Sequence, residues 1–217
     1  MKRFFNFIKL VFVAPTMFFT RLHSNKLDFE GKFHLTRIWA NFILRGLSVR
    51  IKVKNANLIP LEDGYTFISN HDSNYDGLLM ISANPLDFSF FVKEKTRLPY
   101  MTAFLKLIDT IFYSTATIAD DLIAMSQKLS QKHNFHLFIN DPKEASISSD
   151  LLNAAYLSKT AIIPVAIRNA KSIMKFGLNT ITVSFCTPLH FEEYGPLSPR
   201  DTLTEITKRI ENELKEG

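Results

Sequence analysis

The sequence predicts an α/β fold in which a mostly parallel or mixed central sheet is flanked by helices and preceded by a two-helix hairpin. From Val49 onward, short runs rich in β-branched and aromatic residues alternate with stretches of helical periodicity. Several of these runs are almost continuously apolar, which is typical of strands buried on both faces. With 217 residues, 46% of them hydrophobic, the chain is long enough to bury one sizeable core.

The first 54 residues differ in charge from the rest of the chain. They hold 11 lysines and arginines against two acidic residues, a balance of +9, whereas residues 55–217 carry −4. Nine of the 20 phenylalanines also lie in this segment, a composition that suits an anionic membrane or a nucleic acid. Its basic residues alternate with Leu, Ile and Val rather than with spaced aromatics on a polar face, which argues against nucleic acid.

Two helices are expected in this basic segment. Residues 1–22 are apolar without interruption only from Leu10 to Phe19, short of the roughly 20 residues of a membrane span, and no signal-peptidase pattern follows. Residues 35–47 have one apolar face and one polar face. The apolar face holds Leu35, Ile38, Trp39, Phe42, Ile43 and Leu47, and the polar face holds Arg37, Asn41 and Arg45. We therefore expect residues 1–48 to form a hairpin in the membrane interface; packing of both helices on the core is the alternative.

The body of the chain then alternates between strands and helices. Strands are expected at 49–54, 65–69, 88–93, 110–114, 135–139, 161–167 and 179–185, and helices at 99–108, 119–131 and 151–158. The last helix begins after Ser198, because a cap residue, a proline and an acid three residues after the cap stand in the right order. Leu203, Ile206, Ile210 and Leu214 then share one face of it.

The cysteine and histidine content excludes several kinds of site. Cys186 is the only cysteine, so no intramolecular disulfide or Cys-rich zinc site exists, and a lone thiol fits a reducing compartment. Cys186 lies in an apolar run, and we expect it to be buried and inert. His133 and His136 have no Cys or Glu pattern near them, and we expect surface and strand residues rather than metal ligands.

A polar stretch, Asn70–Asp76, directly follows one strand and precedes an apolar run, where α/β proteins place their ligands. In one continuous helix, His71 and Asp76 would point about 140° apart. They can meet if His71 lies in the turn and Asp76 in the first helical turn, with Ser73 as the cap. Asp76 would then fix the imidazole tautomer and leave the other nitrogen as a base. The alternative is that these side chains only satisfy the turn backbone.

Four blocks of sequence resemble those of one family in the same order. Asn70–Asp76 resembles the Asn-His-x4-Asp motif of the glycerolipid acyltransferase family, which includes bacterial 1-acyl-glycerol-3-phosphate acyltransferases. Residues 91–94 with 98–100 resemble the second block, and residues 161–167 closely resemble the fourth. The resemblance extends from about Leu35 to the C-terminus, and it implies an acyltransferase catalytic domain over residues 49–217.

The third block departs from the family pattern. Residues 138–143 read Phe-Ile-Asn-Asp-Pro-Lys where the family has Phe-Pro-Glu-Gly-Thr-Arg, a turn whose arginine holds the acceptor's phosphate. Lys143 stands in place of that arginine, and it can neutralise a phosphate but cannot bind it in a bidentate fork. The resemblance implies His71 and Asp76 as catalytic residues. It also implies an acceptor site formed by Asn70, Lys93, Glu94, Asn140 and Lys143, although Lys93 and Glu94 can equally be a solvated pair at a strand end.

The resemblance implies transfer of a fatty acyl group from an acyl carrier protein or coenzyme A thioester to a lysophospholipid hydroxyl. The expected acceptor is 1-acyl-glycerol-3-phosphate, in membrane phospholipid synthesis. His71 would remove the hydroxyl proton and Asp76 would steady the resulting imidazolium. The chain has no Gly-x-Ser-x-Gly elbow, which agrees with direct transfer to the acceptor. No metal, and no cofactor besides the thioester co-substrate, is expected.

The altered third block keeps two alternatives open. One is an acyltransferase for another membrane-borne alcohol or amine, such as a lysoglycolipid or an aminolipid. The other is a non-catalytic membrane-binding protein of the same fold. Under each interpretation the expected partners are membrane lipids and not nucleic acid, and the expected location is the cytoplasmic face of the cell membrane, as a peripheral or monotopic protein.

Overall fold

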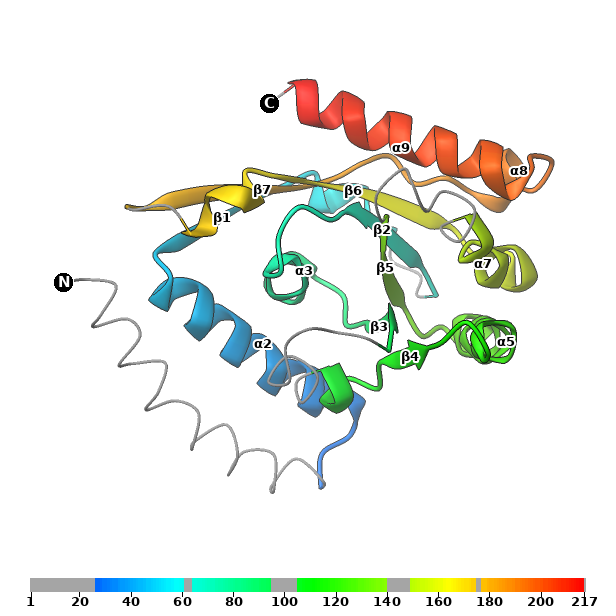
Figure 1. The fold of residues 1–217 in the computed structure, drawn as a ribbon, viewed down its shortest axis with the longest axis horizontal. Helices are drawn as coiled ribbons and strands as arrows, with labels where there is room; N and C mark the ends of the chain where they lie inside the picture. Colours follow the sequence, from blue (N-terminus) through cyan, green and yellow to red (C-terminus); the bar gives the residue numbers. More distant parts are fainter. Residues whose placement is uncertain (1–25, 61–63, 95–104, 140–148, 175–176, 217) are drawn as a thin grey trace.

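A seven-stranded sheet forms the centre of the protein (Figure 1). The computed structural model describes residues 26–60, 64–94, 105–139, 149–174 and 177–216. Within them the strand order is β1-β7-β6-β2-β5-β3-β4. The strands are β1 (Val49–Lys54), β2 (Thr66–Asn70), β3 (Ser89–Lys93), β4 (Ile111–Tyr113), β5 (Phe135–Ile139), β6 (Ile162–Arg168) and β7 (Asn179–Phe185). All seven begin and end within one residue of the predicted bounds.

The sheet is mixed, as predicted. Neighbouring strands run parallel except β6 and β7, which pair antiparallel from Val165 opposite Phe185 to Arg168 opposite Thr182. β2 lies between β5 and β6 and runs parallel to both. Its carboxyl end therefore has a strand end on either side, which is the position of the predicted site.

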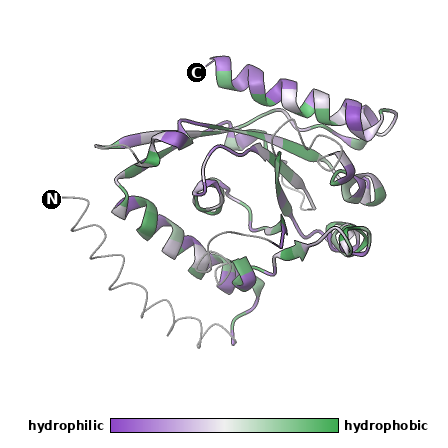
Figure 2. Cartoon of the chain, in the orientation of Figure 1, coloured by the Kyte–Doolittle hydropathy of each residue, from purple (hydrophilic) through white to green (hydrophobic). Residues whose placement is uncertain are grey.

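Helices cover both faces of the sheet (Figure 1). Helices α2 (Phe29–Gly46) and α3 (Asp76–Ala83) contribute to the core on one face, and α5 (Ile118–Ser130), α7 (Asn153–Ser158) and α9 (Pro199–Glu216) contribute to the core on the other. The short helices η1 (Ala56–Leu58), η3 (Ala170–Met174) and α8 (Phe191–Tyr194) lie in connections. Along β6 the side chains alternate between the two cores, as the pleat of a strand requires. Figure 2 shows hydrophobic residues concentrated in the central strands, while α9 is largely hydrophilic.

Most predicted helices are confirmed. α5 begins and ends one residue before the predicted bounds, and α7 begins two residues after them. α9 begins after Ser198, whose hydroxyl bonds the Asp201 carboxylate at 2.6 Å, and Ile206 and Ile210 on its predicted face are buried. Most of the helix predicted for 99–108 lies outside the described residues. Cys186 is buried, as expected.

The second N-terminal helix differs from its predicted pattern. α2 begins six residues earlier than expected, and Phe33, Thr36, Ala40, Ile43 and Leu44 bury one of its faces. Arg37 and Asn41, predicted to lie on a polar face, contact α3: the Arg37 guanidinium donates to the carbonyl oxygens of Ile81 (3.1 Å) and Asn84 (3.0 Å), and Asn41 accepts from Ser82. Ile38 and Phe42 stay 51% and 43% exposed. The helix thus has two apolar faces, one inside the domain and one outside.

The membrane hairpin stays a prediction. Residues 1–22, its first helix, lie outside the described residues, and α2 shares its buried face with the domain core. Among the described helices, none combines the length and apolar composition that a membrane crossing requires.

Candidate active site

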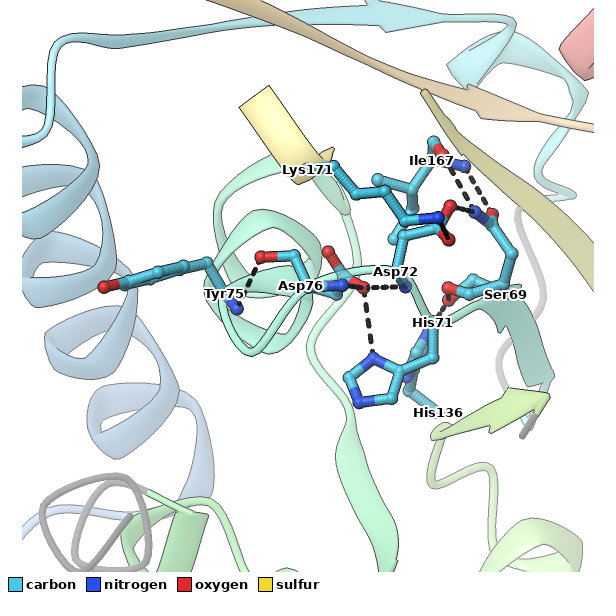
Figure 3. Close-up of polar contacts among 10 residues, drawn as sticks. Ser69, His71, Asp72, Tyr75, Asp76, His136, Ile167 and Lys171 are labelled. Atoms are coloured by element: carbon cyan, nitrogen blue, oxygen red, sulfur yellow. Dashed lines mark hydrogen bonds and ion pairs between the residues drawn. The ribbon is translucent and has the colours of Figure 1, made fainter. Parts of the chain in front are cut away.

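His71 and Asp76 meet at the carboxyl end of β2 (Figure 3). The chain leaves β2 after Asn70, turns through residues 71–75 and enters α3 at Asp76. The His71 Nδ1 lies 3.0 Å from the Asp76 Oδ2, so the predicted contact across the strand–helix boundary is confirmed. The imidazole is 38% exposed while the carboxylate is fully buried. A buried acid thus holds a base that solvent and substrate can reach.

One oxygen of Asp76 organises the whole turn. Besides the imidazole, Oδ2 accepts hydrogen bonds from the backbone amides of Asp72 (2.7 Å) and Ser73 (2.8 Å). The position of Asp76 in the first turn of α3 also places its negative charge near the positive end of the helix dipole. The same carboxylate therefore fixes the backbone of the turn and the side chain of His71.

The expected cap at Ser73 is wrong. Tyr75 is the N-cap of α3 and makes no capping bond with its side chain. The Ser73 hydroxyl instead accepts from the Tyr75 backbone amide at 3.2 Å, inside the turn. The helix begins two residues later than a cap at Ser73 requires, because residues 71–75 form the turn that the Asp76 carboxylate holds through the amides of Asp72 and Ser73.

This geometry suits general-base catalysis. Because the Asp76 carboxylate accepts from Nδ1, the neutral imidazole of His71 carries its proton there and has a lone pair on Nε2. An imidazole in this tautomer can take the proton of a hydroxyl, and Asp76 then stabilises the imidazolium. The described residues contain no cluster of His, Cys, Asp and Glu able to hold a metal ion.

Asn70 joins β6 to the turn of residues 71–75, which carries His71 and is called the catalytic turn below. Its Oδ1 accepts from the Ile167 amide at 2.8 Å, and its Nδ2 donates to the Ile167 carbonyl at 2.9 Å and to the Asp72 carboxylate at 3.0 Å. The side-chain amide thus satisfies both the N–H and the C=O of Ile167 where β2 ends. These contacts give Asn70 a positioning role, and its expected contact with an acceptor stays a prediction.

Two residues near the turn were missed by the sequence analysis. Lys171, in η3 after β6, pairs with the Asp72 carboxylate at 3.1 Å and is 77% exposed. The ring of Phe138, at the end of β5, lies 4.5 Å from the His71 ring and stacks on Phe90 at 5.8 Å. Phe138 opens the altered third block, so its position in the sequence was a usable signal, whereas no pattern marks Lys171.

The other predicted acceptor residues are not brought to His71 by any described contact. Lys93 and Glu94 are exposed where β3 ends, and the Glu94 amide donates to the Tyr113 carbonyl at 2.9 Å. β5 separates β3 from β2. Asn140 and Lys143 lie outside the described residues.

The fold is α/β, and the paired His71 and Asp76 lie at the carboxyl edge of its sheet, where an imidazole held in this way is suited to act as a base. The model of the Acyltransferase family matches residues 50–168, more than half of the chain, including the catalytic turn. The chain belongs to this family, and it is an acyltransferase enzyme related to the glycerolipid acyltransferases.

A solved structure has the same fold. The crystal structure of the 1-acyl-sn-glycerophosphate (LPA) acyltransferase PlsC from Thermotoga maritima matches with a TM-score of 0.75 and 19% sequence identity. The match covers 100% of this chain and 99% of that one. No curated protein matches the chain.

Proposed function

We propose that this acyltransferase moves a fatty acyl group from a thioester to a hydroxyl of a lysophospholipid, with 1-acyl-glycerol-3-phosphate as the acceptor. The observation that carries the proposal is the His71–Asp76 pair, 3.0 Å apart, with Nε2 left free in a chain of this family. The PlsC of the same fold acts on such an acceptor, which supports the choice.

The reaction balances with these residues alone. Nε2 of His71 takes the proton of the acceptor hydroxyl as its oxygen attacks the thioester carbonyl. The tetrahedral intermediate collapses, the carbon–sulfur bond breaks, and the thiolate leaves and takes the proton from the imidazolium. Asp76 stabilises the imidazolium between these steps because its carboxylate is fully buried and already bonded to Nδ1.

The test is turnover of the purified full chain with an acyl thioester and lysophosphatidate, followed by release of free thiol. We expect His71→Ala to abolish turnover while the protein stays folded. His34→Ala is the matched control, since His34 is an exposed histidine on α2. Turnover by His71→Ala equal to that of the control would refute the mechanism.

A second comparison tests whether the acceptor carries a phosphate. We expect Lys143→Ala to raise the apparent KM for lysophosphatidate and to leave the KM for the thioester unchanged, because a lysine in the third block would pair with the acceptor's phosphate and not with the thioester. The altered block, Asn140 to Lys143, favours a second candidate, an acceptor without phosphate. Faster turnover with monoacylglycerol or a lysoglycolipid, and no effect of Lys143→Ala, would favour that candidate.

Turnover measurements also identify which thioester donates the acyl group. Acyl carrier protein and coenzyme A thioesters of one chain length, offered at equal concentration, are compared by kcat/KM. We propose that either thioester is the only co-substrate, so turnover should persist after treatment with a chelator.

We further propose that the protein lies on the cytoplasmic face of the cell membrane. Ile38 and Phe42 form an exposed apolar stripe on α2, within the segment of residues 1–54, which carries a net charge of +9. Deleting residues 1–47 would also remove buried core residues of α2, so the sharper variant is Ile38→Ser with Phe42→Ser. We expect weaker sedimentation with anionic liposomes at an unchanged melting temperature; undiminished sedimentation would contradict the proposal.

A further inference from the structure

A second histidine lies behind the catalytic turn. His136, on β5, is completely buried, among the rings of Phe88, Phe90 and Phe138 at centroid distances of 4.5 to 5.6 Å. Its Nδ1 has no hydrogen-bond partner among the described residues. Burying a polar ring with an unpaired nitrogen in an aromatic core costs folding free energy. The proposed reaction gives this histidine no role.

The hydrogen bonds of His136 lead to the peptide that carries His71. Its Nε2 lies 3.2 Å from the Ser69 hydroxyl, and that hydroxyl donates to the Asn70 carbonyl at 3.2 Å. Because the hydroxyl proton points to this carbonyl, Nε2 of His136 carries a proton and donates to Ser69. The chain of bonds ends on the peptide group between Asn70 and His71.

A second route passes through an aromatic ring. His136 packs edge-on against Phe138 at 4.5 Å, and Phe138 also packs against the ring of His71, again at 4.5 Å. The strand register explains this arrangement, since Phe138 lies opposite Ser69 and His136 opposite Phe67. Figure 3 shows His136, Ser69 and His71 on the same side of the turn.

We propose that His136 is a positioning residue for His71, acting through the Ser69 hydroxyl on the Asn70–His71 peptide and through Phe138 on the imidazole ring. This inference rests on the proposed role of His71 as the base. Both routes fix the direction of the imidazole toward Asp76, so their loss reduces the fraction of enzyme in the reactive geometry. Burial lowers the pKa of His136 to about 3, with the charge of His71 adding to the effect, so the ring stays neutral when His71 is protonated.

The chain contains its own control. Two residues before β5, His133 Nε2 lies 2.7 Å from the Ser89 hydroxyl, which donates to the Ile108 carbonyl at 2.7 Å. This is the same histidine–serine–carbonyl arrangement, and among the described residues it has no contact with residues 70–76. His133→Phe and Ser89→Ala therefore report the general cost of breaking such a pair in this protein.

The experiment compares His136→Phe and Ser69→Ala with these two controls. We expect kcat to fall about five- to tenfold while the acceptor KM stays within about twofold, because only the reactive orientation is lost. The ¹⁵N spectrum of the neutral His71 imidazole should change from one tautomer, protonated on Nδ1, to a mixture. The control variants should keep the wild-type kcat and the single tautomer.

Equal losses in the His133 and His136 variants, or an unchanged kcat and ¹⁵N spectrum in both His136→Phe and Ser69→Ala, would overturn the inference. The two proposals fail separately. If His71→Ala retains turnover, the proposed mechanism fails, while the tautomer of His71 still tests the positioning role without any assay of activity.

Discussion

Replacing Asp76 with asparagine separates the charge of the carboxylate from its geometry. All three hydrogen bonds to Asp76 end on Oδ2, while Oδ1 is buried and has no partner among the described residues. An asparagine can keep its oxygen at the Oδ2 position and place its NH₂ group where Oδ1 lies. Asp76→Asn therefore keeps an acceptor for the turn and for His71 while it removes the negative charge, and it buries an NH₂ group that has no acceptor among the described residues.

The size of the effect follows from the electrostatics of the imidazolium. Two opposite charges about 4 Å apart attract by about 4 kcal/mol at an effective dielectric constant near 20. The imidazole is 38% exposed, and solvent screening reduces this to about 2–4 kcal/mol. Since about 1.4 kcal/mol corresponds to a factor of ten in rate, we expect kcat to fall roughly 30- to 1000-fold.

The stability of two variants provides the control. Asp76→Ala leaves the amides of Asp72 and Ser73 without their acceptor, which costs about 2–5 kcal/mol of unfolding free energy. Asp76→Asn keeps that acceptor and should unfold at a urea concentration much closer to that of the wild type. Turnover is measured as the amount of thiol released, with a reagent that becomes coloured when it reacts with a thiol. A folded Asp76→Asn protein with kcat within about threefold of the wild type would refute the electrostatic role.

Four further predictions concern the side chains of Arg37, Asn70, His136 and Cys186. Arg37→Ala should lower the unfolding free energy by about 2–4 kcal/mol in urea titrations, because the guanidinium holds carbonyls at the end of α3; a loss like that of exposed Arg45→Ala would contradict this. Asn70→Ala should lower both stability and kcat, since two backbone bonds to β6 disappear; full activity would show that the turn needs no such link. Stability should fall by up to about 1.4 kcal/mol per pH unit below pH 6.5 from His136, which takes up protons only when unfolded until about pH 3; His136→Phe should lose this contribution and keep that of His133, whose pKa burial also lowers. Burial raises the pKa of Cys186 to about 12. At pH 8 the Cys186 thiol should therefore react with the thiol reagent far more slowly in the folded protein than in the unfolded protein.

The strands and the catalytic pair were predictable because each depends on local sequence. β5 and β7 begin and end at the predicted residues, since apolar, β-branched runs bounded by polar residues mark buried strands. The contact between His71 and Asp76 needs only a turn that passes into a helix five residues later. No information about distant parts of the chain was required for either.

The surroundings of the site depend on which strands become neighbours. Asn70 bonds Ile167, 97 residues away, because β6 lies beside β2. Phe138 reaches His71 because β5 lies on the other side. Periodicity marks the strands but not their order, so these contacts could not be predicted. The same limit applies to Arg37, whose polar character indicated solvent although its carbonyl partners lie on α3.

The position of β2 explains how a short loop can hold the His71 imidazole in one orientation. Asn70 bonds the loop to β6 on one side, Phe138 supports the imidazole from β5 on the other, and Asp76 binds it from α3. These three supports come from three different elements of the fold. The imidazole is therefore oriented before any substrate arrives, and little conformational entropy is lost when the reaction begins. Because each support can be removed by one substitution, the three losses in kcat should be non-additive, with the double variants of Asn70 and Phe138 losing less than the product of the single effects.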